Sequence, residues 1–356
     1  MGKENSNVLW LYELGKDDPM IAGKKCCHLG EMLQAKMPVP PGFALTLKAY
    51  ETFLQGSGAT DTILQELGKY DKQDLLQNVG KFEAISNDII NDVILKKEMP
   101  GELKEEVARF YEELCATCGL PDTPVAVRSS GPVSMPGQFD TFLNVCGYED
   151  LLTHIVKVWA SSFNARAMAY RLQRDMVLES SPIGVAILKM VNAKSSGVMF
   201  TLDPVNGDPS RIFIEGSWGL GESLVSGQVT PDKFVLDKVT LDISRKTICS
   251  KEMELVRGPN GDVIARDIPP EKQKEPCLTD AEILELAKIG KHIEKHYGVA
   301  QDIEWAIDED LTFPNNIIIL QTRQESIWSK KTKGPVVPKG NATELIARGL
   351  MQGIKV

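Results

Sequence analysis

The stretch from residue 125 to residue 145 reads VAVRSSGPVSMPGQFDTFLNV, and it decides the interpretation of the chain. Its first segment, VAVRSS, and its last, FLNV, have the apolar composition of short strands. The middle, rich in glycine, proline and serine, predicts a loop. Arg128 ends the first strand beside Gly131 and Gly137, whose exposed backbone N–H groups are suited to phosphate. The pattern favours a phosphate-binding loop, although most loops of this composition are plain turns.

Two strands predicted further along the chain, QDIEWAID and NNIIILQTR, carry a second group of polar residues. Because side chains alternate along a strand, Asp302 and Glu304 share one face, and Gln321 and Arg323 share another. If the strands pair antiparallel with these faces aligned, the four side chains converge. Oxygen ligands on rigid strands suit Mg²⁺, and Arg323 would neutralise a phosphoryl group beside it. The alternative is a structural ion pair across an edge.

The remaining pattern mixes helices and strands, which predicts an α/β (α+β) fold. The first half is the more helical, and the second half is rich in strands. The sequence predicts a helix over 25–37 that ends at Pro38, a strand over 42–46, several helices over 49–111 and one helix over 148–175. Further strands are predicted over 183–191 and in the blocks SGVMFTLDP, RIFIEGSWG, DKFVLD and TLDISRKTI. A last helix is predicted from Thr279 to His296, and it begins with a capping box formed by Thr279 and Glu282.

The composition excludes several classes of protein. The 356 residues are 42% hydrophobic and 25% charged, as in globular proteins, and carry a net charge of −9. An acidic surface argues against a nucleic-acid binder, but leaves room for a local cationic pocket. No apolar run reaches the length of a membrane span, and the start does not resemble a signal peptide. We therefore expect a cytoplasmic protein whose seven cysteines are reduced.

Seven blocks, in order between about Gly15 and Arg323, give the chain a specific resemblance. They are AGKKCCHLGEM, VPPGFALT, VAVRSSGPVSMPGQFDTFLNV, SGVMFTLDPVNGD, GSWGLGESLVSGQVTPDKFVLD, QDIEWAID and ILQTR. Together they resemble the ATP-binding module of the pyruvate phosphate dikinase and phosphoenolpyruvate synthase family, which rifampicin phosphotransferase shares. The resemblance implies a two-lobed ATP-grasp fold with ATP and Mg²⁺ in the cleft between the lobes. It also implies boundaries: an N-terminal lobe over 1–190, a C-terminal lobe over 191–327 and a linker-like tail over 328–356.

The resemblance also implies roles for individual residues. Lys25, Arg128 and Arg323 match the cations that hold the transferring phosphates and act in catalysis. Gly137 and Thr141 match the phosphate-loop glycine and threonine, and Glu304 and Gln321 match the metal ligands. The implied ATP-binding set is therefore Lys25, Arg128, Gly137, Thr141, Glu304, Gln321 and Arg323.

Two positions depart from the family pattern. The family often has two glycines before the lysine, whereas this chain has Gly23 and then Lys24. The family's hinge glutamine is Leu188 here, which puts one adenine or ribose contact in doubt. Backbone groups of the hinge would still be able to hold the base.

The family passes phosphate through a histidine in a glycine-rich Thr-Ser-His or Thr-Cys-His motif on a swivelling domain. The four histidines here, His28, His154, His292 and His296, lie in predicted helices without that motif. We therefore expect an ATP-binding subunit of a split dikinase-type enzyme, as in phenylphosphate synthase, whose partner subunit carries the phosphohistidine and the phenol site. The alternatives are the same mechanism with pyruvate or a drug hydroxyl as acceptor, and a module that senses ATP without catalysis.

Overall fold

The computed structural model describes residues 2–70, 75, 79–133, 139–179, 181–258 and 261–328. The helices are α1 (Pro19–Gln34), α2 (Leu47–Gly56), α3 (Ala59–Leu67), α5 (Val79–Asn87), α6 (Gly101–Cys118), α7 (Tyr148–Ala160), α8 (Ala165–Leu172), α9 (Glu222–Val225) and α10 (Asp280–Tyr297). The strands are β1 (Val8–Trp10), β2 (Gly42–Leu45), β3 (Val125–Ser130), β4 (Thr141–Val145), β5 (Gly184–Lys189), β6 (Ala193–Phe200), β7 (Arg211–Trp218), β8 (Asp232–Asp237), β9 (Ile243–Thr247), β10 (Met253–Arg257), β11 (Val263–Asp267), β12 (Gln301–Asp308) and β13 (Ile317–Gln324). This mixture of helices and sheets confirms the predicted α+β class.

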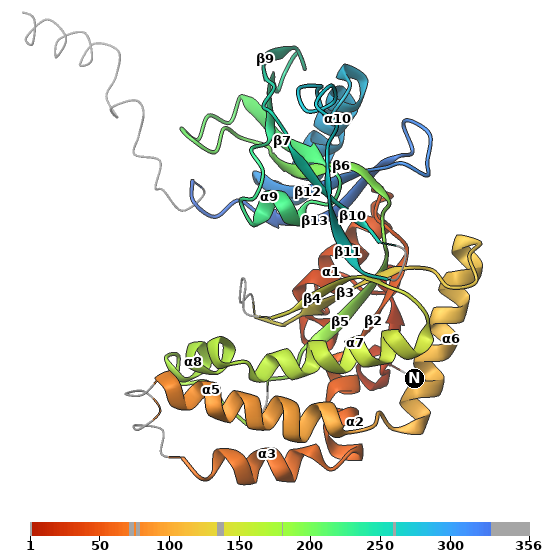
Figure 1. Cartoon of the computed structure of the whole chain (residues 1–356), viewed down its shortest axis with the longest axis vertical. Helices are drawn as coiled ribbons and strands as arrows, with labels where there is room; N and C mark the ends of the chain where they lie inside the picture. Colours follow the sequence, from red (N-terminus) through yellow and green to blue (C-terminus); the bar gives the residue numbers. More distant parts are fainter. Residues whose placement is uncertain are drawn as a thin grey trace, which may run out of the picture.

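The described strands form two large sheets. The first has the order β1-β2-β5-β3-β4, and the second has the order β13-β12-β6-β7-β8-β9. All of their pairings are antiparallel. In Figure 1 the first sheet and α2, α3, α5, α7 and α8 occupy the lower part of the view, and the second sheet and α10 occupy the upper part.

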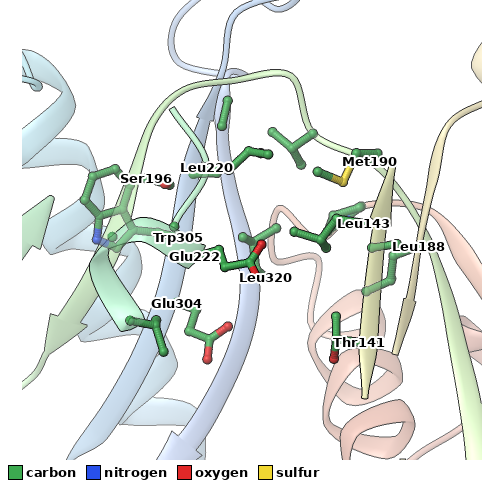
Figure 2. A pocket seen from close by; sticks show the side chains of 18 of the residues that line it. Thr141, Leu143, Leu188, Met190, Ser196, Leu220, Glu222, Glu304, Trp305 and Leu320 are labelled. Carbon is green, nitrogen blue, oxygen red and sulfur yellow. The ribbon is translucent and has the colours of Figure 1, made fainter. Parts of the chain in front are cut away.

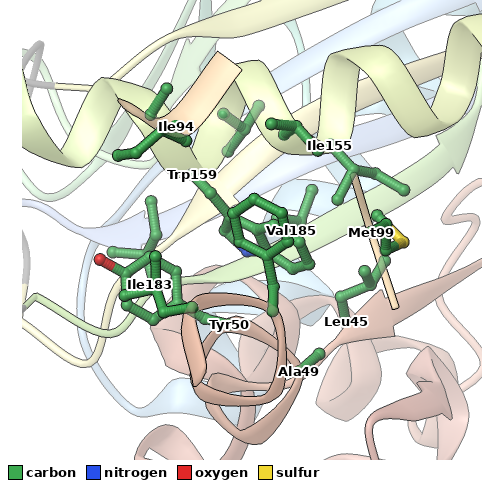
Figure 3. Close-up of a cluster of buried hydrophobic side chains, with 14 of the residues drawn as sticks. Leu45, Ala49, Tyr50, Ile94, Met99, Ile155, Trp159, Ile183 and Val185 are labelled. Carbon is green, nitrogen blue, oxygen red and sulfur yellow. The ribbon is translucent and has the colours of Figure 1, made fainter. Parts of the chain in front are cut away.

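One face of the first sheet packs against helices. Leu45 and Val185 on neighbouring strands join Tyr50 of α2 and Ile155 and Trp159 of α7 in a single buried cluster (Figure 3). The β-branched and apolar residues of these strands suit a sheet that is covered on this face. Burial of such side chains stabilises the fold at roughly 25 cal/mol per Å² of apolar surface.

The helix α1 contacts both sheets. Cys26, Leu29 and Met32 pack in one cluster with Ala186 of the first sheet and Ile319 of the second. The helix therefore lies where the two sheets meet, and side chains at its start reach the space between them.

The second sheet is covered by α10. Thr279 Oγ1 accepts a hydrogen bond from the Glu282 backbone N–H at 3.3 Å, and the Glu282 carboxylate accepts one from the Thr279 N–H at 2.8 Å. This is the predicted capping box, and the helix ends before Gly298, which has a φ of 72°. Ile283 and Leu286 of α10 pack in the same buried cluster as residues of the second sheet.

A separate hairpin, β10–β11, runs between the two sheets. In the middle of β10, the Leu255 carbonyl accepts a hydrogen bond from the Leu220 backbone N–H at 2.8 Å. At its tip, the Asn144 side-chain amide on β4 donates to the carbonyls of Gly258 at 3.3 Å and Asp262 at 2.9 Å. Figure 1 shows β10 and β11 between the two sheets. This hairpin was not among the strands predicted from the sequence.

The single helix predicted over 148–175 is wrong, because the chain breaks into α7, a 3₁₀ turn at Ser161–Phe163, and α8. The Ser161 and Ser162 hydroxyls donate to carbonyls three residues back, at 2.7 Å each. The side chain of Asn164 then caps α8 by accepting from the Ala167 N–H at 2.8 Å. Serine hydroxyls that compete for backbone carbonyls favour such an interruption.

Among the described helices, none is long and apolar enough to cross a membrane.

Candidate functional site: a cationic cluster at the end of an apolar cavity

The turn of α1 that follows Gly23 lies against the end of β3, which brings Lys25 to Arg128. Gly23 interrupts the helix with a φ of 79°. The Lys24 N–H then donates to the Gly131 carbonyl at 2.9 Å, and the Cys26 N–H donates to the Ser130 hydroxyl at 3.1 Å. An added Cβ at Gly23 would lie 2.0 Å from the Ser130 carbonyl oxygen, so only glycine permits this approach.

Arg128 connects the two sheets. Its Nη2 atom lies 3.2 Å from Glu304 Oε2 and 3.5 Å from Gln321 Oε1, and its Nη1 atom lies 3.4 Å from the Leu320 carbonyl oxygen. The Nε atom is buried and has no hydrogen-bond partner among the described residues. A buried donor without a partner is costly in free energy, and a ligand oxygen would relieve that cost.

The predicted convergence of polar side chains on β12 and β13 is confirmed. Glu304 lies opposite Gln321, and Asp302 lies opposite Arg323 in the antiparallel register. A bulge next to Glu304 leaves Leu320 without a paired residue, and its carbonyl is the one that Arg128 contacts.

Lys25 has an unusual protonation equilibrium. Burial and then the Arg128 guanidinium lower the pKa of Lys25 to about 8, and Glu304 opposes them only in part. Within the described part of the chain, no carboxylate forms an ion pair with Lys25. Two neighbouring cations that share one carboxylate create a positive potential, which suits a polyanion.

A cavity of about 300 Å³ adjoins this cluster, between the two sheets. Figure 2 shows Glu304 and Thr141 in the lower part of the view, with Met190 and Leu220 at the top. Its surface is mostly apolar, with further contributions from Leu143, Leu188 and Trp305. A cavity with apolar walls and a few charged groups at one end is typical of a ligand-binding site.

The structure places the predicted site residues in different settings. Thr141 lies opposite Arg128 on β4 and lines the cavity. Arg323 is exposed, and its Nη2 atom pairs with Asp302 Oδ2 at 2.6 Å, so it is not part of the contact around Arg128. Gly137 lies outside the described residues. Of the two positions that depart from the family pattern, Leu188 lines the cavity. The side chain of Lys24 is exposed, so a lysine is accommodated where the family often has glycine.

Three further residues contribute to the site and were given no role from the sequence. Glu222, at the start of α9, lines the cavity (Figure 2). His28, one helical turn after Lys25, lines a small space with Arg128 and Gln321, and burial lowers its pKa. Ser130 fixes the start of α1. The block GLGES, with two glycines before Glu222, is the sequence signal that could have indicated Glu222. For His28 the signal is its position three residues after Lys25, which places both side chains on one face of a helix.

Magnesium fits these side chains only together with phosphate oxygens. Glu304 and Gln321 offer a carboxylate and an amide oxygen that lie opposite each other. Among the described residues, no group of three or more acidic, histidine or cysteine side chains is arranged to hold a metal ion. Mg²⁺ commonly takes one or two protein oxygens and completes its coordination with water and substrate phosphates. Glu304 and Gln321 are therefore the residues that would hold it.

We expect ATP binding to take up a proton at about pH 9, because free Lys25 has largely lost its proton above pH 8 and a bound polyphosphate favours the charged form. The affinity should accordingly fall as the pH rises above 8. Calorimetric titrations in two buffers of different ionisation enthalpy measure the uptake, which should approach one proton. Lys25→Arg should bind without uptake, because arginine does not titrate in this range. Equal binding enthalpies for the unmodified chain in both buffers would contradict this assignment.

Comparisons with known proteins identify the family of the chain. Residues 19–342 match the family model described as pyruvate phosphate dikinase, AMP/ATP-binding domain. The chain is 38% identical to a probable phosphoenolpyruvate synthase of Staphylothermus marinus, over 98% of this chain and 46% of that protein. It is 38% identical to another of Methanothermobacter thermautotrophicus, over 96% of this chain and 49% of that protein. It is 34% identical to the phosphoenolpyruvate synthase of Aeropyrum pernix, over 98% and 46%. The chain thus spans about half the length of these relatives.

Proposed function

The chain belongs to the family of the AMP/ATP-binding domain of pyruvate phosphate dikinase, and from this premise we propose that it binds Mg-ATP in the cavity between its two sheets. We further propose that the two sheets and their helices are the two lobes of an ATP-grasp fold. The antiparallel sheets on either side of the cavity support this proposal.

The observation that carries the proposal is the pair of cations formed by Lys25 and Arg128. The two side chains are held close together although the Arg128 guanidinium disfavours the protonated form of Lys25. In addition, the Arg128 Nε has no described hydrogen-bond partner. Such an arrangement is unfavourable without a ligand, so its benefit must come from a bound anion. The triphosphate of ATP supplies that charge at the polar end of the cavity.

The apolar end of the cavity accounts for the base. Leu188, Met190 and Leu220 provide flat apolar surface of the kind on which a purine packs. Leu188 replaces the glutamine of the family pattern, so we propose that backbone groups beside Met190 hold the edge of the adenine. The ribose would then occupy the space between the two ends of the cavity, close to Glu222.

In the proposed reaction, a histidine attacks the β-phosphorus of ATP and AMP leaves. Hydrolysis releases the γ-phosphate, and the phosphohistidine passes its phosphoryl group to an acceptor. Lys25, Arg128 and Arg323 would stabilise charge on the transferring group, and Glu304 and Gln321 would hold Mg²⁺, which would neutralise phosphate charge. None of the four histidines lies in a carrier motif, so we propose that the attacking histidine lies outside these 356 residues, on a partner subunit.

We propose pyruvate as the acceptor, because the relatives are named phosphoenolpyruvate synthases. Phenol, the acceptor expected from the sequence, has no support from these relatives. The acceptor site would lie on the partner, so the residues of this chain do not discriminate between the two.

Calorimetry with the isolated chain and Mg-ATP tests the proposal directly. We expect binding with one ATP per chain and almost no turnover. Adding a histidine-bearing partner and pyruvate should then yield AMP and inorganic phosphate, as followed by nucleotide chromatography. Absence of ATP binding would contradict the proposed site, and ADP as the sole nucleotide product would contradict the proposed reaction.

A further inference from the structure

A second cavity, of about 170 Å³, lies beside the base end of the first one. The two cavities share Ala193 and Leu220 as a common wall. The second cavity is lined by the start of β6, the hairpin β10–β11 and the segment after β11. Its volume is little more than half that of the first cavity, which suits a smaller ligand.

Charged side chains dominate the wall of this second cavity. Four cations line it, against two carboxylates: Lys194, Arg257, Arg266 and Lys272 against Glu254 and Glu309. Neither the ATP site nor the packing of the hairpin uses this excess of positive charge.

Two of the four cations are neutralised within the protein. Arg266 donates from Nε and Nη2 to Glu254 Oε1, at 3.0 and 2.7 Å. Lys194 Nζ lies 2.6 Å from Glu282 Oε1. Because Glu254 and Glu282 are nearly buried, these pairs form fixed walls of the cavity.

The other two cations are less closely neutralised. The Lys272 ammonium lies 4.3 Å from the centre of the Trp218 ring, and in the described part of the chain no carboxylate pairs with it. The shortest contact of Arg257 with a carboxylate is 3.7 Å, to Asp310, which is half exposed. Packing on an aromatic ring restrains a lysine while leaving its three N–H donors available.

We propose that this second cavity binds a small multivalent oxyanion, of the phosphate or dicarboxylate type, between Arg257 and Lys272. Multivalent oxyanions accept several charge-assisted hydrogen bonds at once, which matches a fork of donors and an ammonium that face a polar cavity. Glu309, exposed at the rim, restricts the site to ligands with more than one negative charge, because a single charge would be offset by its carboxylate. The inference goes beyond the proposed function and does not depend on it.

Calorimetric titration with inorganic phosphate and, separately, with malonate tests the proposal. The test variant is Arg257→Gln combined with Lys272→Gln. The matched control is Arg245→Gln combined with Lys274→Gln, which removes the same charge from exposed positions outside the cavity. Both double variants keep Lys25 and Arg128. Any phosphate that binds beside these two residues therefore binds equally to both variants and does not contribute to the difference between them.

We expect the unmodified chain and the control to bind at least one of the two anions, and the test variant to bind it at least tenfold more weakly. Loss confined to phosphate identifies a phosphate-type ligand, and loss confined to malonate identifies a dicarboxylate. The proposal is overturned if the unmodified chain binds neither anion, or if the test variant binds as the control does. If the test variant does not fold, Lys272→Gln alone serves instead, with Lys274→Gln as its control. ATP titrations on the same proteins separate the outcomes, because failure to bind ATP concerns only the proposed function.

Discussion

Replacing Arg128 with glutamine is expected to weaken Mg-ATP binding by on the order of a hundredfold or more. The change removes the guanidinium that contacts Glu304, Gln321 and the Leu320 carbonyl, together with the buried Nε that has no described partner. It also removes the ion pair that orients the Glu304 carboxylate, the proposed Mg²⁺ ligand. Two effects of the same sign explain the size of the expected loss.

Calorimetry at low and moderate salt measures this loss, and circular dichroism checks that the variant is folded. Arg211→Gln is the control, because Arg211 also pairs with carboxylates, Asp208 and Asp237, but lies on β7 and does not line the cavity. It should bind Mg-ATP within about twofold of the unmodified chain. An Arg128 variant that is folded and keeps its affinity would remove the main support for the proposed function.

Replacing Gly23 with alanine should lower the free energy of unfolding by on the order of 3 kcal/mol or more. The new Cβ would lie 2.0 Å from the carbonyl oxygen of Ser130 and 2.4 Å from its carbonyl carbon, so backbone must move. Alanine is also strained at the φ of 79°. The displacement would separate Lys25 from Arg128, and ATP binding should be lost together with stability.

Gly58 provides a matched control for this prediction. It has a φ of 68°, but an added Cβ there meets no atom within 4 Å. Gly58→Ala therefore carries the strain of a positive φ, in the left-handed helical region, without the steric clash, and should cost about 1 kcal/mol. Urea denaturation of both variants measures the difference. Similar losses at the two positions would mean that the contact between α1 and β3 tolerates a side chain.

Local patterns predicted much of the fold. The capping box at Thr279 and Glu282 correctly marked the start of α10, and alternation correctly predicted which faces of β12 and β13 carry polar side chains. Both features depend on residues that are close in the sequence or repeat along one strand. The break in the helix after Ala160 was missed, because the apolar period continues through Ser161 and Ser162 although their hydroxyls bind backbone carbonyls.

The site was predicted through the family resemblance rather than from local patterns. Lys25 and Arg128 are more than a hundred residues apart, and no periodicity indicates that they are neighbours. The buried pair of Asp232 and Lys251, with Nζ 2.7 Å from Oδ1 and neither side chain exposed, was missed for the same reason. This ion pair forms because the chain between β8 and β10 returns to the start of β8, and the predicted strands alone do not indicate that path.

The contact between Asn144 and the hairpin tip has a consequence for sequence variation. Among the described residues, the tip's side of these hydrogen bonds consists of the backbone carbonyls of Gly258 and Asp262, which any residue would supply, whereas position 144 contributes a side-chain amide. Asn144 also has a φ of 59°, a conformation that asparagine adopts more readily than most residues. Related sequences should therefore keep asparagine at this position while the residues of the tip drift, and a change at 144 should remove the hydrogen bonds that join the hairpin tip to β4.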